Sequence, residues 1–279
     1  MPELPEVETV RRALAPVLEG ATIVAADIVD PRLTRPRDPR AVAAELVGER
    51  VAEVGRRGKY LLLRLESGRT LVVHLRMTGS LRHAAEPGAL PPDTHRRAVL
   101  RLDTGTVVGY RDVRRFGTWT LLEPDEEAVY LRGRLGPEPL APSFTSSRLK
   151  SILAGRRATV KTVLLDQRRI AGIGNIYADE ALWSARLHPR REAGSLAPDE
   201  IARLHRAVRA ALRRGVELQG STLRDYATPD GAEGGMQHEF HVYGRGGEPC
   251  DRCGVQIERI VVGGRGTWVC PRCQRAPGR

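Results

Sequence analysis

The sequence has no run of 18 apolar residues, only four cysteines and almost no lysine. The lack of a long apolar run predicts that no helix spans a membrane. The first residues lack a basic region followed by an apolar stretch, so we expect no signal peptide and a cytoplasmic location. There is no internal repeat or low-complexity tract, and 279 residues suffice for one large domain or two smaller ones with real cores.

The basic residues are divided very unevenly between arginine and lysine. Lysine occurs only at positions 59, 150 and 161, and arginine supplies the other 42 of the 45 basic side chains. This bias is typical of a GC-rich genome and indicates no function by itself. Arginine cannot provide a titratable amine, however, so each lysine is of interest. The net charge of +11 indicates a polyanionic partner such as nucleic acid.

The first six residues carry the strongest chemical signal. Pro2 is a small second residue, so we expect removal of Met1, which leaves Pro2 with a free secondary amine. The pKa of an α-amino group is about 8, so part of this amine is nucleophilic near neutral pH. It can attack an electrophilic sugar carbon and form an iminium, with Glu3 as a general acid and Glu6 one helical turn later. The same residues also fit an ordinary helix start, because Pro5 and Glu6 suit a first turn.

The four cysteines form the second strong signal. They are arranged as Cys250-x2-Cys253-x16-Cys270-x2-Cys273, which is typical of a tetrahedral four-thiolate zinc site. Two short strands between the pairs predict a β-hairpin held by one structural Zn²⁺. Disulfides are the alternative, although a cytosolic chain disfavours them. Arg265 follows the glycines of the hairpin turn, where it can reach a phosphate or simply face solvent.

The pattern along the chain predicts two different halves. Apolar residues at helical spacing predict a helix over 5–18, ended near Gly20. The region 21–123 is mostly strands, with hairpins between 60–65 and 70–76 and between 99–102 and 107–110, which favours an antiparallel sandwich or barrel. Residues 86–93 are expected to form an irregular loop, and 133–143 an interdomain linker.

The second half is predicted to be helical up to the zinc hairpin. The glycines before Asn175 predict a tight turn, with Asn175 as the N-cap of the next helix and a backbone that can bind phosphate. An ordinary cap is the alternative. Residues 198–214 form an arginine-rich helix whose charged face is either solvated or a binding surface. Residues 220–247 are expected to be a mobile loop of functional length.

Taken together, these motifs resemble those of the bacterial formamidopyrimidine-DNA glycosylases. The resemblance covers essentially the whole chain. It rests on residues 2–8 (PELPEVE), 58–61 (GKYL), 74–81 (HLRMTGSL), 114–117 (RRFG), 135–140 (LGPEPL), 172–177 (GIGNIY), 242–245 (VYGR) and the terminal cysteines.

The resemblance implies an α+β protein with two domains. Residues 1–132 would form a catalytic antiparallel β-sandwich with a leading helix, followed by a linker over 133–143. Residues 144–237 would form a helical helix-two-turn-helix domain with a loop that covers the lesion, and 238–279 the zinc β-hairpin. A monomer that binds damaged double-stranded DNA, but no membrane, is implied, in the bacterial cytoplasm and associated with the nucleoid through DNA.

The implied activity is base-excision repair of oxidised purines, namely 8-oxoguanine and formamidopyrimidines. Pro2 would attack C1′ of an extruded nucleotide, because that carbon is inaccessible inside a duplex. Glu3 would protonate the sugar ring oxygen. Lys59 would bind a flanking phosphate and assist β- and δ-elimination, unless it is a surface lysine at a strand edge. Glu6 would position water or the amine, or serve only as a helix charge.

Further residues match positions of the family that hold DNA. Asn175 and Arg265 would clamp the phosphates around the lesion, with Arg265 part of the catalytic set. Met77, Arg114 and Phe116 would fill the gap left by the extruded nucleotide, with Arg114 facing the orphaned cytosine; Met77 and Phe116 could instead be core residues. Additional DNA contacts are expected from His95, Arg156 and Lys161, with a surface role equally open for Lys161.

Two other functions remain open. The first is an endonuclease VIII-like glycosylase for oxidised pyrimidines, which the residues at positions 77, 114 and 116 disfavour. The second is a non-catalytic DNA-binding zinc protein that keeps the fold. The presence of Pro2, Glu3 and Lys59 argues against the second alternative.

Overall fold

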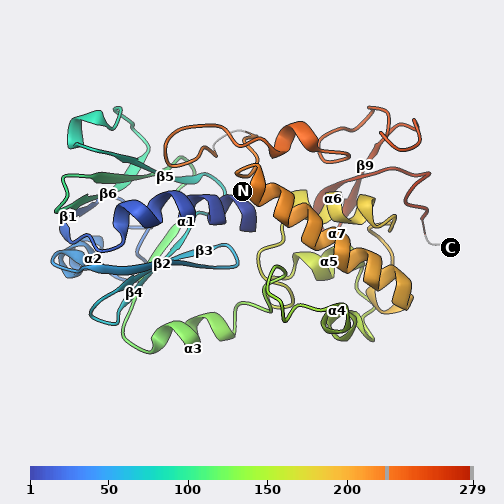
Figure 1. Cartoon of the computed structure of the whole chain (residues 1–279), viewed down its shortest axis with the longest axis horizontal. Helices are drawn as coiled ribbons and strands as arrows, with labels where there is room; N and C mark the ends of the chain where they lie inside the picture. The colour runs from blue at the N-terminus through green and yellow to red at the C-terminus, as the bar shows by residue number, and fades with distance from the viewer. Residues whose placement is uncertain (224–225, 277–279) are drawn as a thin grey trace. The chain divides into compact units, whose positions relative to one another are not determined.

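In the computed structural model, which describes residues 1–223 and 226–276, the chain divides into two contact-defined units. Unit 1 comprises residues 1–133 and 218–235, and unit 2 comprises 134–217 and 236–279. Segment 218–235, which we had grouped with the helical domain, therefore clusters with the first unit. Figure 1 shows the elements of both units along the chain.

Unit 1 contains two four-stranded antiparallel sheets, with strand orders β1-β6-β7-β5 and β2-β3-β4-β8. The strands of the first sheet are β1 (Ile23–Ile28), β5 (Gly79–Ala84), β6 (Arg96–Leu102) and β7 (Val107–Asp112). Those of the second are β2 (Val51–Arg57), β3 (Tyr60–Leu65), β4 (Thr70–His74) and β8 (Thr118–Leu122). The helical elements of unit 1 are α1 (Leu4–Leu18), α2 (Pro39–Leu46), η1 (Pro87–Ala89) and α3 (Glu126–Arg132).

Both sheets and α1 share one apolar core. Val7, Val10 and Leu14 lie on the buried face of α1, as their helical spacing predicts, and pack in one cluster with Leu63 of β3 and Leu100 of β6. Figure 1 shows α1 beside β2, with which it makes direct contacts. The predicted β-sandwich with a leading helix is confirmed.

Unit 2 is mainly helical and ends in a two-stranded antiparallel hairpin. Its elements are α4 (Ser146–Leu153), α5 (Val160–Leu165), α6 (Asn175–Ser184), η2 (Ala193–Ser195), α7 (Pro198–Glu217), η3 (Met236–Glu239), β9 (Glu258–Val262) and β10 (Arg265–Val269). Helix α6 contacts α5, α7 and β10, so it lies at the centre of the unit. The buried carboxylate of Glu180 on α6 accepts hydrogen bonds from the backbone N–H groups of His241, Val242 and Tyr243, which fixes the segment leading to the zinc hairpin.

Three local predictions need correction. Helix α2 was not expected within the strand-rich region, although Asp38 caps it by accepting hydrogen bonds from the N–H groups of Arg40 and Ala41. The irregular segment 86–93 includes the short helix η1. The N-cap of α6 is Gly174 rather than Asn175, which is the first helical residue.

Candidate active site and nucleic-acid interface

The residues at the start of α1 are buried and tightly held. Pro2 is buried and Glu3 is only 2% exposed, whereas the preceding Met1 is 49% exposed. The Oε2 atom of Glu6 accepts a hydrogen bond from the Glu3 N–H at 2.8 Å. This is the bond of a capping box in which the side chain of the third helical residue binds the N-cap backbone, and it fixes the turn that presents Pro2. The extended backbone of Glu3 then leads directly into the helix.

The second oxygen of Glu6 binds a segment more than 200 residues later. Glu6 Oε1 accepts hydrogen bonds from the Ser221 N–H at 2.9 Å and from the Ser221 hydroxyl at 3.2 Å. A side chain on Gly220 has no room here, because an added Cβ would lie 2.7 Å from Glu6 Cγ, and the backbone φ is +81°. The buried Tyr226 hydroxyl donates to the Gln219 carbonyl at 3.0 Å. Glu6 is thus a buried link between α1 and residues 219–221 rather than a solvated helix charge.

Lys59 lies in the turn between β2 and β3 and is 4% exposed, so it is not a surface lysine. Gly58 before it has a φ of +57°, which favours glycine and lets the turn close. Arg56, near the end of β2, donates to Glu8 of α1 at 3.0 Å. Although burial opposes its ionisation, hydrogen bonds from Arg11, Arg12 and Arg56 lower the pKa of Glu8 to about 2. This ion pair fixes the start of α1 next to the strand end that precedes Lys59.

His74 closes β4 beside the same turn. Its ring makes an edge contact with Tyr60 at 4.6 Å between centroids, and its Nδ1 accepts a hydrogen bond from the Arg76 N–H at 2.9 Å. Burial, together with the positive charges of Arg76 and Lys59, lowers the pKa of His74 to about 3. The ring is therefore neutral at pH 7 and serves as a structural acceptor.

The loop over 114–117 is held by two buried aspartates. Arg115 has a φ of +59°, an uncommon conformation for a residue with a side chain, and it pairs with Asp30 through two hydrogen bonds of 2.7 Å. Asp112 is 1% exposed and accepts a hydrogen bond from the Gly117 N–H at 2.7 Å. Thr78 accepts one from the Arg114 N–H at 3.0 Å.

This scaffold brings three of the predicted site residues together at the surface. Met77 is 42% exposed and Phe116 48% exposed, so neither is a core residue. The Arg114 guanidinium lies 4.7 Å from the centre of the Phe116 ring, and its Nη1 is 2.9 Å from Met77 Sδ. Two exposed apolar side chains with a cation between them are suited to insertion into a base stack.

In unit 2, Asn175 and Arg265 lie close together. The Asn175 amide donates to the Gly266 carbonyl at 2.8 Å, which ties the first turn of α6 to the residue after Arg265. Arg265 is exposed at the start of β10, directly after the turn formed by Gly263 and Gly264. An exposed guanidinium next to a helix N-terminus is a suitable arrangement for binding phosphate.

The position of Lys161 contradicts its predicted role as a DNA contact. Its side chain is completely buried, and Nζ lies 2.6 Å from Asp179 Oδ1 and 2.7 Å from Thr267 Oγ1. Asp179 also accepts a hydrogen bond from the Trp268 N–H at 3.1 Å. Lys161 thus connects α5, α6 and β10 from inside unit 2, and its ammonium group is not available to a ligand at the surface.

The two less securely matched residues lie at separate places. His95 is half-buried before β6 in unit 1, and its Nδ1 is 3.2 Å from Arg97 Nη2. Arg156 is half-buried after α4 in unit 2, with its Nε 2.5 Å from the Ile152 carbonyl oxygen. Each retains exposed side-chain surface, so a phosphate contact stays a prediction for both.

The four cysteines fit a zinc ion. Their sulfur atoms all lie within 4.8 Å of one another, with 3.4 Å between Cys253 and Cys270 and 4.0 Å between Cys250 and Cys273. Zinc–sulfur bonds of about 2.3 Å in a tetrahedron place sulfur atoms about 3.8 Å apart, so the set needs little adjustment. Four thiolates leave no position for water, and the site is a structural zinc centre.

Several positioning residues had no signal in the sequence. No motif of the sequence marks them, and their residue types are common ones. They are Asp30, Asp112, Asp179, Gly220 and Ser221. The three aspartates and Ser221 act through contacts that local sequence does not show. Each binds a residue far away in the sequence or the backbone N–H of a loop.

Comparisons with known proteins agree over nearly the whole chain. The formamidopyrimidine-DNA glycosylase N-terminal domain matches residues 1–119, the H2TH domain of the same enzymes matches 135–227, and the zinc finger found in FPG and IleRS matches 247–276. The formamidopyrimidine-DNA glycosylase of Roseiflexus is 49% identical and covers 99% of this chain and 100% of its own. The Bacillus subtilis enzyme is 46% identical, with 98% and 99% covered.

Solved structures give the same result. The MutM (Fpg) protein from Thermus thermophilus is 47% identical, with a TM-score of 0.88 over 99% of this chain and 100% of its own. A mutant of the Lactococcus lactis enzyme in complex with Fapy-dG containing DNA is 38% identical, with a TM-score of 0.91 over the same shares. With relatives of 46–49% identity over 98–99% of its length, the chain belongs to the formamidopyrimidine-DNA glycosylase family.

Proposed function

We propose that the protein excises 8-oxoguanine and formamidopyrimidines from duplex DNA and then cuts the strand by β- and δ-elimination. The family makes it a base-excision-repair enzyme with glycosylase and AP lyase activity. Relatives have been solved with Fapy-dG containing DNA and with DNA that contains an abasic site, which are the substrates of the two steps.

The first step requires the amine of Pro2, which is free only after Met1 is removed. The amine attacks C1′ of the extruded nucleotide, and the bond between C1′ and the base breaks, with the base leaving as it gains a proton. Glu3 protonates the sugar ring oxygen, so the ring opens and C1′ becomes an iminium on Pro2. The burial of Glu3 and the Glu6 hydrogen bond to its N–H support this assignment, because both restrict where the amine points.

The second step is elimination from the iminium. The iminium makes the 2′ proton acidic, so its removal expels the 3′ phosphate, and a further elimination expels the 5′ phosphate. Water then releases the sugar fragment from Pro2. Lys59, held in the turn that follows the Glu8–Arg56 pair, is assigned to binding a flanking phosphate and assisting these eliminations.

The DNA contacts are divided between the units. Asn175 and Arg265 are assigned to the phosphates around the lesion, and His95 and Arg156 to phosphates farther away. Met77, Arg114 and Phe116 are assigned to the gap left by the extruded nucleotide, with Arg114 facing the orphaned cytosine. Residues 222–237 are assigned to covering the extruded base; residues 224–225 lie outside the described part of the chain. We expect a monomer in the bacterial cytoplasm.

The observation that carries the preference for purines is the complex of a relative, 38% identical over 99% of this chain, with DNA that contains Fapy-dG, a lesion derived from guanine. The joint exposure of Met77, Arg114 and Phe116 supports their insertion into the gap. None of the helices described in the structure is long and apolar enough to cross a membrane.

The test compares excision from two matched duplexes, one with 8-oxoguanine opposite cytosine and one with thymine glycol opposite adenine. The proposal predicts release of 8-oxoguanine at least about tenfold faster, which corresponds to 1.4 kcal/mol of transition-state binding. Faster release of thymine glycol would assign the protein to oxidised pyrimidines instead. Binding without release from either duplex would indicate a non-catalytic protein.

A further inference from the structure

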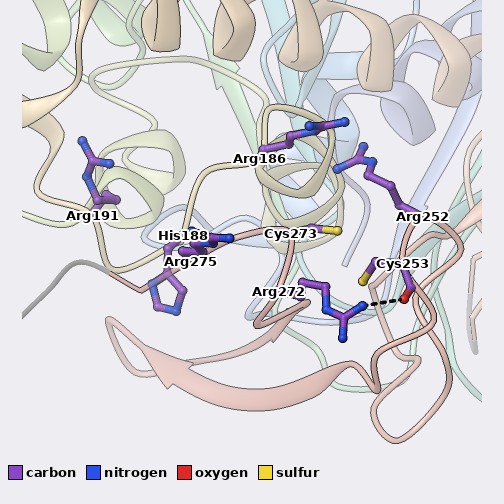
Figure 2. A pocket seen from close by; sticks show the side chains of 8 residues that line it. All are labelled: Arg186, His188, Arg191, Arg252, Cys253, Arg272, Cys273 and Arg275. Carbon is purple, nitrogen blue, oxygen red and sulfur yellow. Dashed lines mark hydrogen bonds between the residues drawn. The ribbon is translucent and has the colours of Figure 1, made fainter.

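A strongly basic pocket of about 470 Å³ lies beside the zinc site in unit 2. Figure 2 shows the residues that line it, which are five arginines, one histidine and two of the zinc cysteines: Arg186, Arg191, Arg252, Arg272, Arg275, His188, Cys253 and Cys273. No carboxylate is among the residues that line it. None of the five arginines belongs to the catalytic residues or to the DNA contacts assigned above.

The positive charge of this pocket is only partly balanced. Arg191 pairs with Glu200 at 3.1 Å, whereas the other four arginines have no ion pair with any carboxylate in the described part of the chain. A zinc ion with four thiolates carries two negative charges, which leaves part of these four positive charges unmatched. The negative charge of the zinc–thiolate centre therefore balances only part of the positive charge of these arginines.

Contacts with neighbouring groups hold Arg252 and the segment that carries Arg272 and Arg275 in place. Arg252 stacks over the Trp183 ring at 3.9 Å and donates to the Trp183 carbonyl at 3.0 Å. The Gln274 side chain is completely buried and donates to the Leu187 carbonyl at 2.9 Å, which fixes the segment carrying Arg272 and Arg275. Figure 2 shows Arg272 beside Cys253, to whose carbonyl oxygen its guanidinium donates at 3.4 Å.

His188 supplies a buried hydrogen-bond donor to the same pocket. Its side chain is 7% exposed, and Nδ1 accepts a hydrogen bond from the Arg190 N–H at 3.1 Å. Burial and the positive charge of Arg190 lower the pKa of His188, so the ring is neutral. A neutral imidazole whose Nδ1 is an acceptor carries its hydrogen on Nε2, so the ring adds a hydrogen-bond donor to a pocket whose lining includes no carboxylate.

We propose that this pocket binds a phosphate group through the guanidinium groups of Arg186, Arg252 and Arg275 together with His188. Planar guanidinium groups pair with phosphate oxygens through two hydrogen bonds at once, and several of them suit a multiply charged group. The phosphate comes either from a nucleic-acid strand outside the lesion contacts or from a small phosphorylated molecule such as pyrophosphate.

The first experiment measures pyrophosphate binding to the zinc-loaded full-length protein by calorimetry at fixed ionic strength. The double variant R186Q/R275Q removes two charges from the pocket. The control R206Q/R213Q removes two charges from the exposed surface of α7, so net charge is matched. We expect at least tenfold weaker binding for the pocket variant than for the control, with zinc content measured in both. Equal binding by both variants would overturn a site for small phosphates.

The second experiment separates the two sources of phosphate with an undamaged duplex, so it does not depend on the proposed glycosylase activity. The quantity measured is the slope of the logarithm of the DNA-binding constant against the logarithm of the salt concentration. If the ligand is a strand phosphate, this slope is smaller in magnitude for R186Q/R275Q than for the control, by about one to two. A change in pyrophosphate binding alone assigns the pocket to small phosphates. The proposal is overturned if the pocket variant matches its control in both experiments, or if its only defect is loss of zinc.

Discussion

Lys161 and Asp179 form an ion pair of 2.6 Å in which both side chains are completely or almost completely buried. Thr267 and the Trp268 N–H bind the same two groups, so the pair joins α5 and α6 to β10 of the zinc hairpin. Burial raises the pKa of Asp179 to about 7, with the charge of Lys161 acting in the opposite direction. The positive charge of Lys161 therefore favours the ionised form of the Asp179 carboxyl group, which burial disfavours.

Replacing Lys161 with Met removes this compensation and leaves a buried carboxyl group without its cation. Removal of one partner of a buried pair costs about 3–5 kcal/mol, so K161M should lower the free energy of unfolding by that amount in a urea titration. The control is K150M, because Lys150 is an exposed lysine on α4. Similar unfolding midpoints for the two variants would show that the pair does not stabilise unit 2.

Gly220 and Gly231 provide a matched pair for testing the contact with Glu6. Both have a positive φ, of +81° and +92°, but only Gly220 lies against Glu6, since nothing lies within 4 Å of a Cβ added to Gly231. Both substitutions by Ala strain the backbone, and G220A additionally displaces Glu6. We expect G220A to slow base release at least about tenfold more than G231A, equivalent to 1.4 kcal/mol. Equal rates for the two variants would show that the contact between Gly220 and Glu6 does not support base release.

His74 should make the protein less stable in mild acid. Its folded pKa is about 3, so between pH 6.5 and 3 the unfolded chain binds a proton that the folded protein does not. Stability is therefore retained above pH 6.5 and lost as the pH falls, by about 1.4 kcal/mol per pH unit for this group. H74N should reduce the slope of unfolding free energy against pH, whereas H238N, at an exposed histidine, should not. An unchanged slope in H74N would contradict the assignment.

Removal of zinc should disrupt the hairpin and the surface that carries Arg265. The Trp183 ring nitrogen donates to Cys250 Sγ at 3.3 Å, so a tryptophan reports on the metal site. Treatment with a chelator should change tryptophan fluorescence and weaken binding to an abasic-site duplex, and both effects should reverse when zinc is restored. C253S should behave like the chelated protein. Full DNA affinity without the metal would contradict a structural role for zinc.

Features with a local sequence signal were predictable. The helical spacing of Val7, Val10 and Leu14 gave α1, turn residues gave the β3–β4 and β6–β7 hairpins, and the cysteine spacing gave the zinc site. Helix α2 has a local signal of its own, because Asp38 is a good N-cap residue and Pro39 suits a first helical turn.

Contacts between distant segments could not be read in the same way. Ser221 and Glu6 are 215 residues apart, and Asp30 and Arg115 are 85 apart, with nothing in either local pattern to connect them. Lys161 shows the same limit, because its match to a basic position of the family suggested a DNA contact, whereas its partners lie inside unit 2. Only the folded chain shows which charged groups are buried.

Borohydride trapping shows whether Pro2 acts as the nucleophile. The protein is incubated with a duplex that contains 8-oxoguanine opposite cytosine, reduced, and analysed by intact mass and peptide mapping. We predict a covalent adduct on an N-terminal Pro2 that lacks Met1. If zinc-loaded protein without Met1 binds this duplex but forms no adduct, or forms it on Lys59, the proposed mechanism is wrong.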